Sequence, residues 1–203
     1  MDPNFIREQI ATHTPNVHVT RGDHNLNPGM DPNDPLTPAA VLVPLILRED
    51  GITILFTQRT EQMAKHPGQI SFPGGHVDDG DADAEATALR ETEEEVGLSR
   101  QHIELIGRLD NYVIRTGFLV TPVVGIVSPP FDISPDSYEV DDVFEVPMQF
   151  LMNRKNHERH SREFKGQKRE FYAMPFEGRY IWGATAGMIV NLHDILKTPK
   201  RSS

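Results

Sequence analysis

Three glutamates at helical spacing carry the clearest chemistry in this sequence. Glu91, Glu94 and Glu95 lie at i, i+3 and i+4, so a helix would place them on one face about 100° wide. Like charges this close repel one another, and a divalent cation is the simplest counter-charge. Carboxylate oxygens favour Mg²⁺ or Mn²⁺, which keep sites for water and substrate phosphate. The alternative is an acidic helix face that contacts only solvent.

The neighbouring residues predict a helix that presents these glutamates. Asp83 or a near neighbour is placed to cap its N-terminus, and Gly97 is placed to end it. Leu89 and Val96 flank the carboxylate face and are expected to pack inward, whereas Glu93 points the other way. The glutamates should therefore lie at the rim of a core.

The segment from Gly75 to Leu98 resembles the Nudix box, commonly written G-x5-E-x7-R-E-U-x-E-E-x-G-U, where U is a bulky aliphatic residue. The R-E-x-x-E-E-x-G-L half is intact. Three departures remain: Asp81 stands where the first Glu is expected, one extra residue separates it from Arg90, and Thr92 holds the first aliphatic position. The resemblance implies a Nudix hydrolase.

Within the intact half, the resemblance assigns a role to each charged residue. Glu91 and Glu95 are the expected primary metal ligands, and Glu94 is an additional one. Arg90 is expected to orient the helix carboxylates by bidentate pairing. These assignments place catalysis and metal binding on a single helix face.

Further parts of the expected site lie outside that half. A backbone carbonyl at Gly74 or Gly75 is expected to complete the metal coordination. Glu139 is the first candidate for a general base or third metal ligand, since Nudix hydrolases often draw one from a loop outside the box; Glu94 and Glu145 follow. For Glu139, an ordinary surface carboxylate is the alternative.

Residues 56–75, FTQRTEQMAKHPGQISFPGG, resemble the extra signature of the coenzyme A pyrophosphatase branch of Nudix hydrolases, roughly L-T-x-R-x-x-x-L-R-x-H-x-G-Q-x-x-F-P-G-G. An Asp at the first-Glu position and the altered spacing are also usual in that branch. Two mismatches are Met63 for Leu and Ala64 for the second Arg. The matching residues are Arg59, His66, Gly68, Gln69, Phe72, Pro73, Gly74 and Gly75.

Two basic segments are candidates for substrate contact. Arg59, Lys65 and His66, beside backbone amides near Gly68 and Gly74, would form a cradle for a pyrophosphate. A second basic stretch spans residues 154–169, and its Lys165 and Lys168 are expected to meet the 3′-phosphate of coenzyme A. For both segments, a loop or hairpin that is merely solvated is the alternative.

The composition is that of one globular domain. The chain has 203 residues, of which 37% are hydrophobic and 25% charged. Its formal net charge of −10 disfavours nonspecific binding to nucleic acid or anionic membranes. The lack of cysteine excludes disulfides, thiolate metal sites and a cysteine nucleophile. The expected partner is a small-molecule substrate, with no nucleic acid and no membrane, and a homodimer is left open.

The hydropathy pattern contains no apolar run of membrane-spanning length, and the start, MDPNFIREQI, lacks the apolar region of a signal peptide. A cytoplasmic protein is therefore expected. The expected organisation is an N-terminal helix and extended lead-in over residues 1–38, a Nudix hydrolase domain over 39–198 and a tail over 199–203.

The pattern of apolar runs and turn residues predicts an α/β sandwich with a mixed β-sheet and flanking helices. The Nudix resemblance implies the same arrangement, a Nudix-type α/β/α sandwich. Pro44 is expected at an edge or bulge. His193 and Asp194 are expected off the apolar stripe of a C-terminal helix. The predicted elements are a helix in 2–13, hairpins at 39–59, 103–127 and 163–174, a strand and helical turn from 143, and a helix from 181.

These expectations combine into one activity. A metal-dependent enzyme would hydrolyse the pyrophosphate of coenzyme A or acyl-coenzyme A to 4′-phosphopantetheine, or its acyl form, and adenosine 3′,5′-bisphosphate. The first alternative is the same chemistry on another nucleoside diphosphate derivative, such as ADP-ribose or a dinucleotide. The second is a Nudix-fold binding module without turnover.

Overall fold

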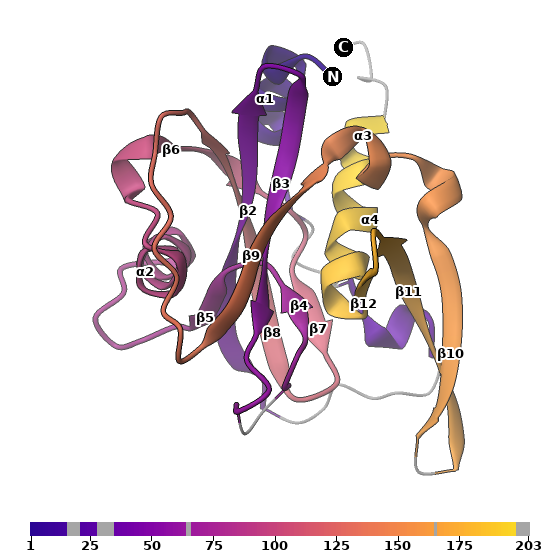
Figure 1. The fold of residues 1–203 in the computed structure, drawn as a ribbon. Coiled ribbons are helices and arrows are strands. Elements are labelled where there is room, and N and C mark those ends of the chain that lie inside the picture. Colours follow the sequence, from indigo (N-terminus) through magenta and orange to yellow (C-terminus); the bar gives the residue numbers. More distant parts are fainter. Residues whose placement is uncertain (16–20, 28–34, 64–65, 165, 198–203) are drawn as a thin grey trace.

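The computed structural model describes residues 1–15, 21–27, 35–63, 66–164 and 166–197. They contain a nine-stranded mixed sheet and a separate three-stranded antiparallel sheet. Figure 1 shows α2 (Ala84–Val96) on one side of the large sheet, and α4 (Ala184–Lys197) between its other side and the small sheet. The predicted α/β class, with a mixed sheet and flanking helices, is confirmed.

The centre of the large sheet is the predicted hairpin. β2 (Thr37–Arg48) and β3 (Gly51–Arg59) are antiparallel and meet at an Asp-Gly turn. β2 also pairs in parallel with β8 (Phe118–Val127), which makes it an interior strand. Its consecutive apolar residues are buried on both faces, as is typical of such a strand.

Pro44 lies inside this central strand, so the expectation of an edge or bulge position is wrong. On the side away from β8, β2 pairs with β5 (Gly74–His76) through residues 39–41 and with β3 through residues 45–48. Pro44 falls between these two ladders, where a missing backbone N–H costs no ladder hydrogen bond.

The other strands of the large sheet confirm the remaining hairpin predictions with added detail. The segment before β8 is broken into two strands, and both pair antiparallel with β8. The predicted short strand pairs antiparallel with β3 and leads into a helical turn. These elements are β6 (Ile103–Arg108), β7 (Tyr112–Ile114), β9 (Val140–Pro147) and α3 (Met148–Leu151).

Several strand ends lie together on one side of the large sheet, at the edge that runs across the strands. β2 and β8 start there, and the antiparallel β3 ends there. Thr37 is the partner of Phe118 at this edge, and Arg59 is the partner of Val140 at the start of β9. We call it the lower edge, from its place in Figure 1. The loops that join these strand ends therefore lie on the same side of the large sheet.

Two very short strands lie at this edge, one beside β3 and one beside β2. β4 (Ile70–Ser71) pairs with β3, whereas β5 pairs with β2. Between them, the Pro73 carbonyl accepts a hydrogen bond of 2.9 Å from the Leu42 N–H. The Gly-Gly turn is therefore fixed to the central strand before the chain enters α2.

The N-terminal segment packs on the domain. The predicted helix is α1 (Pro3–Thr12), capped by Asp2, and its Ile6 and Ile10 are fully buried in the main core. Beyond it, the two-residue strand β1 (Arg21–Gly22) pairs in parallel with β7. No helix in the described ranges is long and apolar enough to cross a membrane. The predicted division at residue 38 stays a prediction.

The C-terminal third contains the small sheet and α4. The hairpin predicted over residues 163–174 is present but longer, as β10 (Glu158–Phe164) and β11 (Gln167–Phe176). A third strand, β12 (Arg179–Trp182), follows. Ile181 was expected in the final helix, but it lies in β12 because the helix begins only at Ala184. His193 was expected outside the apolar stripe and is instead 8% exposed, against the ring of His157.

Candidate active site

The acidic helix has the predicted ends. The Asp83 side chain accepts a hydrogen bond of 2.8 Å from the Ala86 N–H, and Gly97 closes the helix with a left-handed φ of 70°. Val96 is fully buried, and Glu93 points away and pairs with Arg100 at 3.0 Å. The helix therefore presents the remaining carboxylates toward β5 and the lower edge.

The three predicted metal ligands differ strongly in exposure. The Glu95 side chain is 7% exposed, Glu91 is 18% exposed, and Glu94 is 60% exposed. Burial raises the pKa of Glu91, against the lowering effect of Arg90. The carboxylate face thus runs from the core, at Glu95, out to solvent at Glu94.

Glu95 is the buried member of this face. Its Oε2 accepts a hydrogen bond of 3.2 Å from the Gly74 N–H, and its Oε1 lies 3.6 Å from Nη1 of Arg59. Burial raises the pKa of Glu95 to about 7, although the Gly74 hydrogen bond opposes this shift. Glu95 therefore connects the helix to the Gly-Gly turn and to the end of β3.

Arg90 joins the acidic residues of the loop and the helix. Its Nη1 donates to Glu91 Oε1 at 2.9 Å and to Glu94 Oε2 at 3.0 Å. Its other nitrogens bind both oxygens of Asp81, and Nη2 also donates to the His76 carbonyl at 3.1 Å. The predicted orienting contact of Arg90 is present, and it extends to the residue at the irregular position of the box.

Thr87 is a member of this network that the sequence did not single out. Its hydroxyl donates to Asp81 Oδ2 at 2.8 Å, and the Asp78 N–H donates to the same oxygen at 3.0 Å. Thr87 lies three residues before Arg90, so helical spacing puts both side chains on one face. That spacing was the signal that could have identified it.

The Gly-Gly turn packs too closely against α2 and β2 for either glycine to carry a side chain. A Cβ at Gly75 would clash with the carboxyl group of Glu91, and a Cβ at Gly74 would clash with the Ala40 backbone. Gly74 also has a φ of 156°, which favours glycine. The turn thus holds its backbone directly against the carboxylate face.

Arg59 connects this face to the predicted base. Its Nη2 lies 3.8 Å from Oε2 of Glu139, and the Glu139 carbonyl accepts from the Thr60 N–H at 2.9 Å. The Glu139 carboxylate is 41% exposed. Glu145, a later candidate, lies opposite Leu55 in the middle of β3 and pairs with Arg48 at 2.5 Å. Of the two, only Glu139 shares an arginine with the helix carboxylates.

The loop before the Gly-Gly turn folds back onto Arg59. The Arg59 N–H donates to the Gln69 carbonyl at 3.0 Å, and the Gln69 N–H donates to the His66 carbonyl at 3.2 Å. His66 is exposed, with a left-handed φ of 56°. Ala64, a mismatch to the coenzyme A signature, and Lys65, a candidate for pyrophosphate contact, lie outside the described residues.

The donor set suits a hard divalent cation, because it consists of carboxylate oxygens on one face beside the carbonyls of a glycine turn. Among the described residues, however, no three acidic or histidine side chains are arranged to hold a metal ion. Arg90 donates hydrogen bonds to Glu91 and Glu94, and the Gly74 N–H donates one to Glu95. Metal binding would require these side chains to exchange partners.

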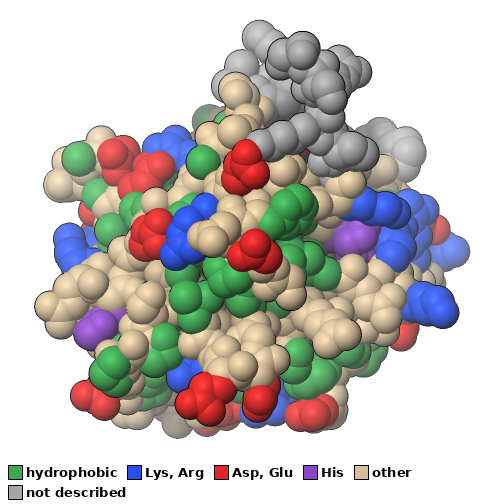
Figure 2. Space-filling model, turned by 90° about the horizontal axis from the view of Figure 1, so that it is seen from above, with side chains coloured by type: hydrophobic (Ala, Val, Ile, Leu, Met, Phe, Trp, Pro, Cys, Tyr) green, Lys and Arg blue, Asp and Glu red, His purple; other side chains and the backbone are tan. Residues whose placement is uncertain are grey.

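The predicted basic contacts lie on another part of the molecule. Lys168 is in β11, across α4 from α2, and Figure 2 shows Lys and Arg side chains gathered on the side where Figure 1 places β10. Lys168 is 71% exposed, with its Nζ 3.8 Å from Glu170 Oε1. Lys165 lies outside the described residues. The structure does not bring Lys168 to the carboxylate face.

Comparisons with known proteins relate the chain to one family of sequences. The NUDIX domain family model matches residues 36–165. The uncharacterized Nudix hydrolase NudL of Enterobacter sp. (strain 638) is 40% identical over 154 residues, 76% of this chain and 80% of that protein. NudL of Escherichia coli (strain K12) gives the same identity and coverage. A Caenorhabditis elegans Ap4A hydrolase structure has a TM-score of 0.48 and 22% identity, covering 55% of this chain and 80% of that one. The domain match and the NudL relatives show that the chain belongs to the Nudix hydrolase family.

Proposed function

We propose that the substrate of this Nudix pyrophosphatase is coenzyme A or acyl-coenzyme A. Hydrolysis of the pyrophosphate bond would give 4′-phosphopantetheine, or its acyl form, and adenosine 3′,5′-bisphosphate. The observation that carries the proposal is the contact between Arg59 and Glu95, whose Nη1 and Oε1 are 3.6 Å apart. It joins the segment that resembles the coenzyme A branch to the carboxylate face of the Nudix box.

The proposed metal ligands are Glu91 and Glu95, with Glu94 as an additional ligand and a backbone carbonyl of Gly74 or Gly75. When bound, Mg²⁺ or Mn²⁺ would neutralise phosphate charge and activate water for attack on phosphorus. Glu91 and Glu95 are the more buried carboxylates, where water competes least for a cation. Arg90 would then keep its bidentate pair with Asp81 beside them.

The proposed phosphate contacts come from Arg59, His66 and Gln69. A pyrophosphate repels an anionic nucleophile, so positive charge beside it lowers the barrier. Arg59 lies between two carboxylates, Glu95 and Glu139, at 3.6 and 3.8 Å. These distances are longer than those of tight ion pairs, so the guanidinium can turn toward a phosphate at moderate cost.

Glu139 is the proposed general base. It is 41% exposed, so water can reach it, and Arg59 holds it on the same side as Glu95. The substitution Glu139→Gln should lower kcat much more than it raises the KM for coenzyme A. Unchanged kcat would assign Glu139 to the solvated surface.

A substrate panel tests the proposed activity directly. Coenzyme A, an acyl-coenzyme A, dephospho-coenzyme A, ADP-ribose and a dinucleotide would each be incubated with protein and Mg²⁺ or Mn²⁺, and products identified by mass. The expected result is the highest kcat/KM on coenzyme A or acyl-coenzyme A. A higher kcat/KM on ADP-ribose or a dinucleotide would overturn the proposal that coenzyme A is the substrate. Ligand binding by calorimetry without any product would instead indicate a binding module.

The predicted contact of Lys165 and Lys168 with the 3′-phosphate is retained as a separate proposal. Lys168→Glu and Lys165→Glu should raise the KM for coenzyme A more than that for dephospho-coenzyme A. The exposure of Lys168, 71%, makes it available to a ligand and makes the substitution harmless to packing. Equal effects on both substrates would contradict the contact.

A further inference from the structure

The outer face of the small sheet carries aromatic and basic side chains. In the β10–β11 ladder Arg162 is the direct partner of Arg169, and in the β11–β12 ladder Ala173 is the partner of Trp182. Alternation along the strands therefore places Arg162, Arg169, Phe171 and Trp182 on one face. The Phe171 and Trp182 rings meet at 5.1 Å between centroids.

Two arginines opposite each other are an unfavourable cross-strand pair, because like charges in this position destabilise a sheet. Arg162 stacks over the Trp182 ring at 6.0 Å. Arg169 donates from Nη2 to the side chain of Gln167. Its buried Nε has no hydrogen-bond partner among the described residues. An anion between the two guanidinium groups would relieve the repulsion.

A segment far away in the sequence closes this face into a pocket. The Asn27 side chain donates to the carbonyls of Asp23 and Glu170, at 2.7 and 3.0 Å, and accepts from the Glu170 N–H at 2.9 Å. Asn27 is 8% exposed, so these hydrogen bonds are well shielded and fix the N-terminal segment to β11. The hydrogen bonds of the Asn27 side chain therefore hold this wall of the pocket against β11.

The resulting pocket has a volume of about 250 Å³. Arg115, from the turn between β7 and β8, lines it together with both arginines of the sheet. Of its two acidic residues, Asp23 accepts from the Tyr112 hydroxyl at 3.1 Å and the Arg115 N–H at 3.0 Å, and Glu170 lies 3.8 Å from Lys168. Arg162 and Arg169, beside two carboxylates that already have partners, leave the pocket suited to an anion.

We propose that this pocket binds a phosphorylated nucleoside, with phosphate on Arg162 and Arg169 and the base against Trp182. Aromatic stacking accepts any planar base, and guanidinium groups bind phosphate through two parallel hydrogen bonds. The pocket is smaller than the roughly 300–1,000 Å³ of sites for drug-sized ligands, so it suits one end of a larger molecule. The same chemistry occurs in the adenosine 3′-phosphate end of coenzyme A and in free adenosine 3′,5′-bisphosphate.

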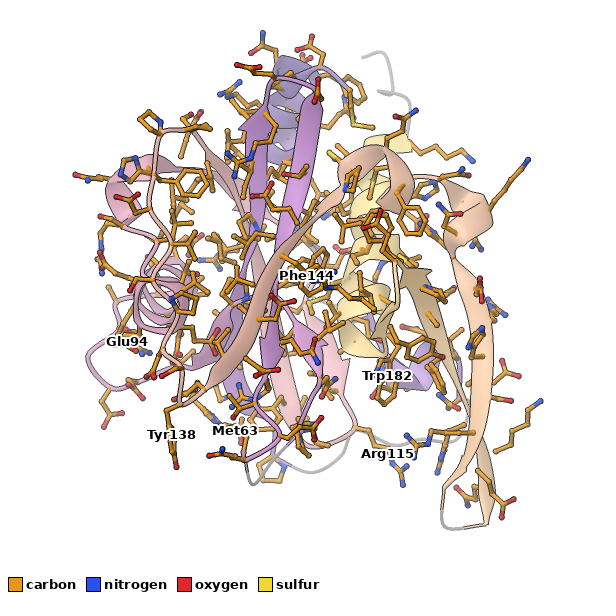
Figure 3. All side chains as sticks on the ribbon, viewed as in Figure 1. Met63, Glu94, Arg115, Tyr138, Phe144 and Trp182 are labelled. Carbon is orange, nitrogen blue, oxygen red and sulfur yellow. The ribbon has the colours of Figure 1, made fainter. Side chains whose placement is uncertain are left out.

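The position of the pocket connects it to the candidate active site. Figure 3 shows Arg115 and Trp182 on the side of the molecule between the lower edge and the β10–β11 hairpin. Phe118, three residues after Arg115, contacts the ring of His76 at 5.1 Å, and the His76 carbonyl accepts from Arg90. The turn before β8 therefore lies between the pocket and the carboxylate face. Occupancy by the substrate's own adenosine end rests on the proposed function, whereas binding of a nucleotide does not.

Trp182 is the single tryptophan of the chain, so intrinsic fluorescence reports on this pocket. The first experiment titrates adenosine 3′,5′-bisphosphate into the full chain in the presence of a metal chelator, with calorimetry in parallel. Saturable quenching of the fluorescence and a matching binding heat are expected. Lack of saturable binding up to millimolar ligand would overturn the proposal, whatever the protein hydrolyses.

Matched variants test which residues bind the ligand. Arg162→Ala should weaken binding of adenosine 3′,5′-bisphosphate by about tenfold or more, because it removes a charge-assisted contact. Arg159→Ala is the control, since Arg159 lies in the same strand on the opposite face and stacks on Tyr172 at 5.6 Å. Trp182→Phe, followed by calorimetry, checks the stacking contact. Equal affinities in R162A, R159A and the unmodified chain would overturn the proposal.

The same variant separates the two sources of the ligand. If the pocket binds the adenosine end of the substrate, R162A raises the KM for coenzyme A several-fold and leaves kcat unchanged. If the pocket binds a free nucleotide, R162A loses affinity for adenosine 3′,5′-bisphosphate and leaves the KM for coenzyme A unchanged. Both results support a nucleotide site. A protein that binds the bisphosphate but hydrolyses nothing would overturn only the proposed function.

Discussion

Arg90 binds both carboxylate oxygens of Asp81, with Nε 3.0 Å from Oδ1 and Nη2 2.8 Å from Oδ2. The Asp81 side chain is only 7% exposed. The Arg90 guanidinium, together with the Asp78 N–H and the Thr87 hydroxyl, holds the pKa of Asp81 well below its usual range. Asp81 stands where the Nudix box has a glutamate, and within its longer loop it still makes a bidentate pair with the box arginine.

The first prediction concerns this pair. Asp81→Asn removes the charge that holds Arg90, so Arg90 should shift and disturb Glu91 and Glu94. Outer partners of metal ligands typically change metal affinity or activity by about 10–100-fold when mutated. We expect a loss in this range, measured as the hydrolysis rate during a Mg²⁺ titration. Asp79→Asn, at an exposed position of the same loop, is the control and should change little.

The second prediction concerns the close approach of Gly75 to Glu91. Gly75→Ala places a methyl group where the Glu91 carboxyl group lies, so the carboxylate must move. Displacement of a reacting or binding group by about 1 Å can cost about 100-fold in rate. A Cβ at Gly80 would have no neighbour within 4 Å, which makes Gly80→Ala the control. Similar rates in both variants would show that Glu91 is not needed in its observed place.

The local elements could be predicted from the sequence because their signals are short-range. Asp83 and Gly97 are both cap residues, and they bound α2 as expected. The Asp-Gly turn between two apolar, β-branched runs likewise gave the central hairpin. The family resemblance supplied the layer arrangement, which periodicity alone does not determine.

The relations between distant segments could not be predicted. The position of Pro44 depends on which strand pairs on each side of β2, and this is decided by tertiary pairing. The opposition of Arg162 and Arg169 depends on hairpin register, which no single-strand pattern contains. The sequence therefore indicated a basic stretch but not which of its side chains face one another across the hairpin.

The third prediction compares two glutamates of the same helix face. Glu95→Gln keeps the size and the hydrogen bond from the Gly74 N–H but removes a buried charge. If Glu95 binds the metal, activity should fall by more than the roughly 100-fold that loss of an outer partner can cause. Glu94→Gln should have a smaller effect because Glu94 is 60% exposed. Full activity in E95Q would contradict the proposed ligand set.

The fourth prediction concerns Glu145 and pH. Glu145 accepts from Arg48 at 2.5 Å and from the Thr53 hydroxyl at 2.5 Å. These contacts outweigh burial and lower the pKa of Glu145 below its usual value. A carboxylate with a lowered folded-state pKa stabilises the fold above its unfolded pKa of about 4.3, and this stability is lost as the pH falls through the folded-state value.

Glu145→Gln should therefore lower the free energy of unfolding near neutral pH by about 0.5–1 kcal/mol, because part of the pair is screened by solvent. Urea unfolding across a pH series should show this difference shrinking on acidification below the unfolded pKa of about 4.3. Glu49→Gln, at an exposed neighbouring position, is the control. Hydrolysis by E145Q should stay unchanged, because Glu145 pairs with Arg48 and not with Arg59. A difference in stability that is constant with pH would assign the effect to packing and not to charge.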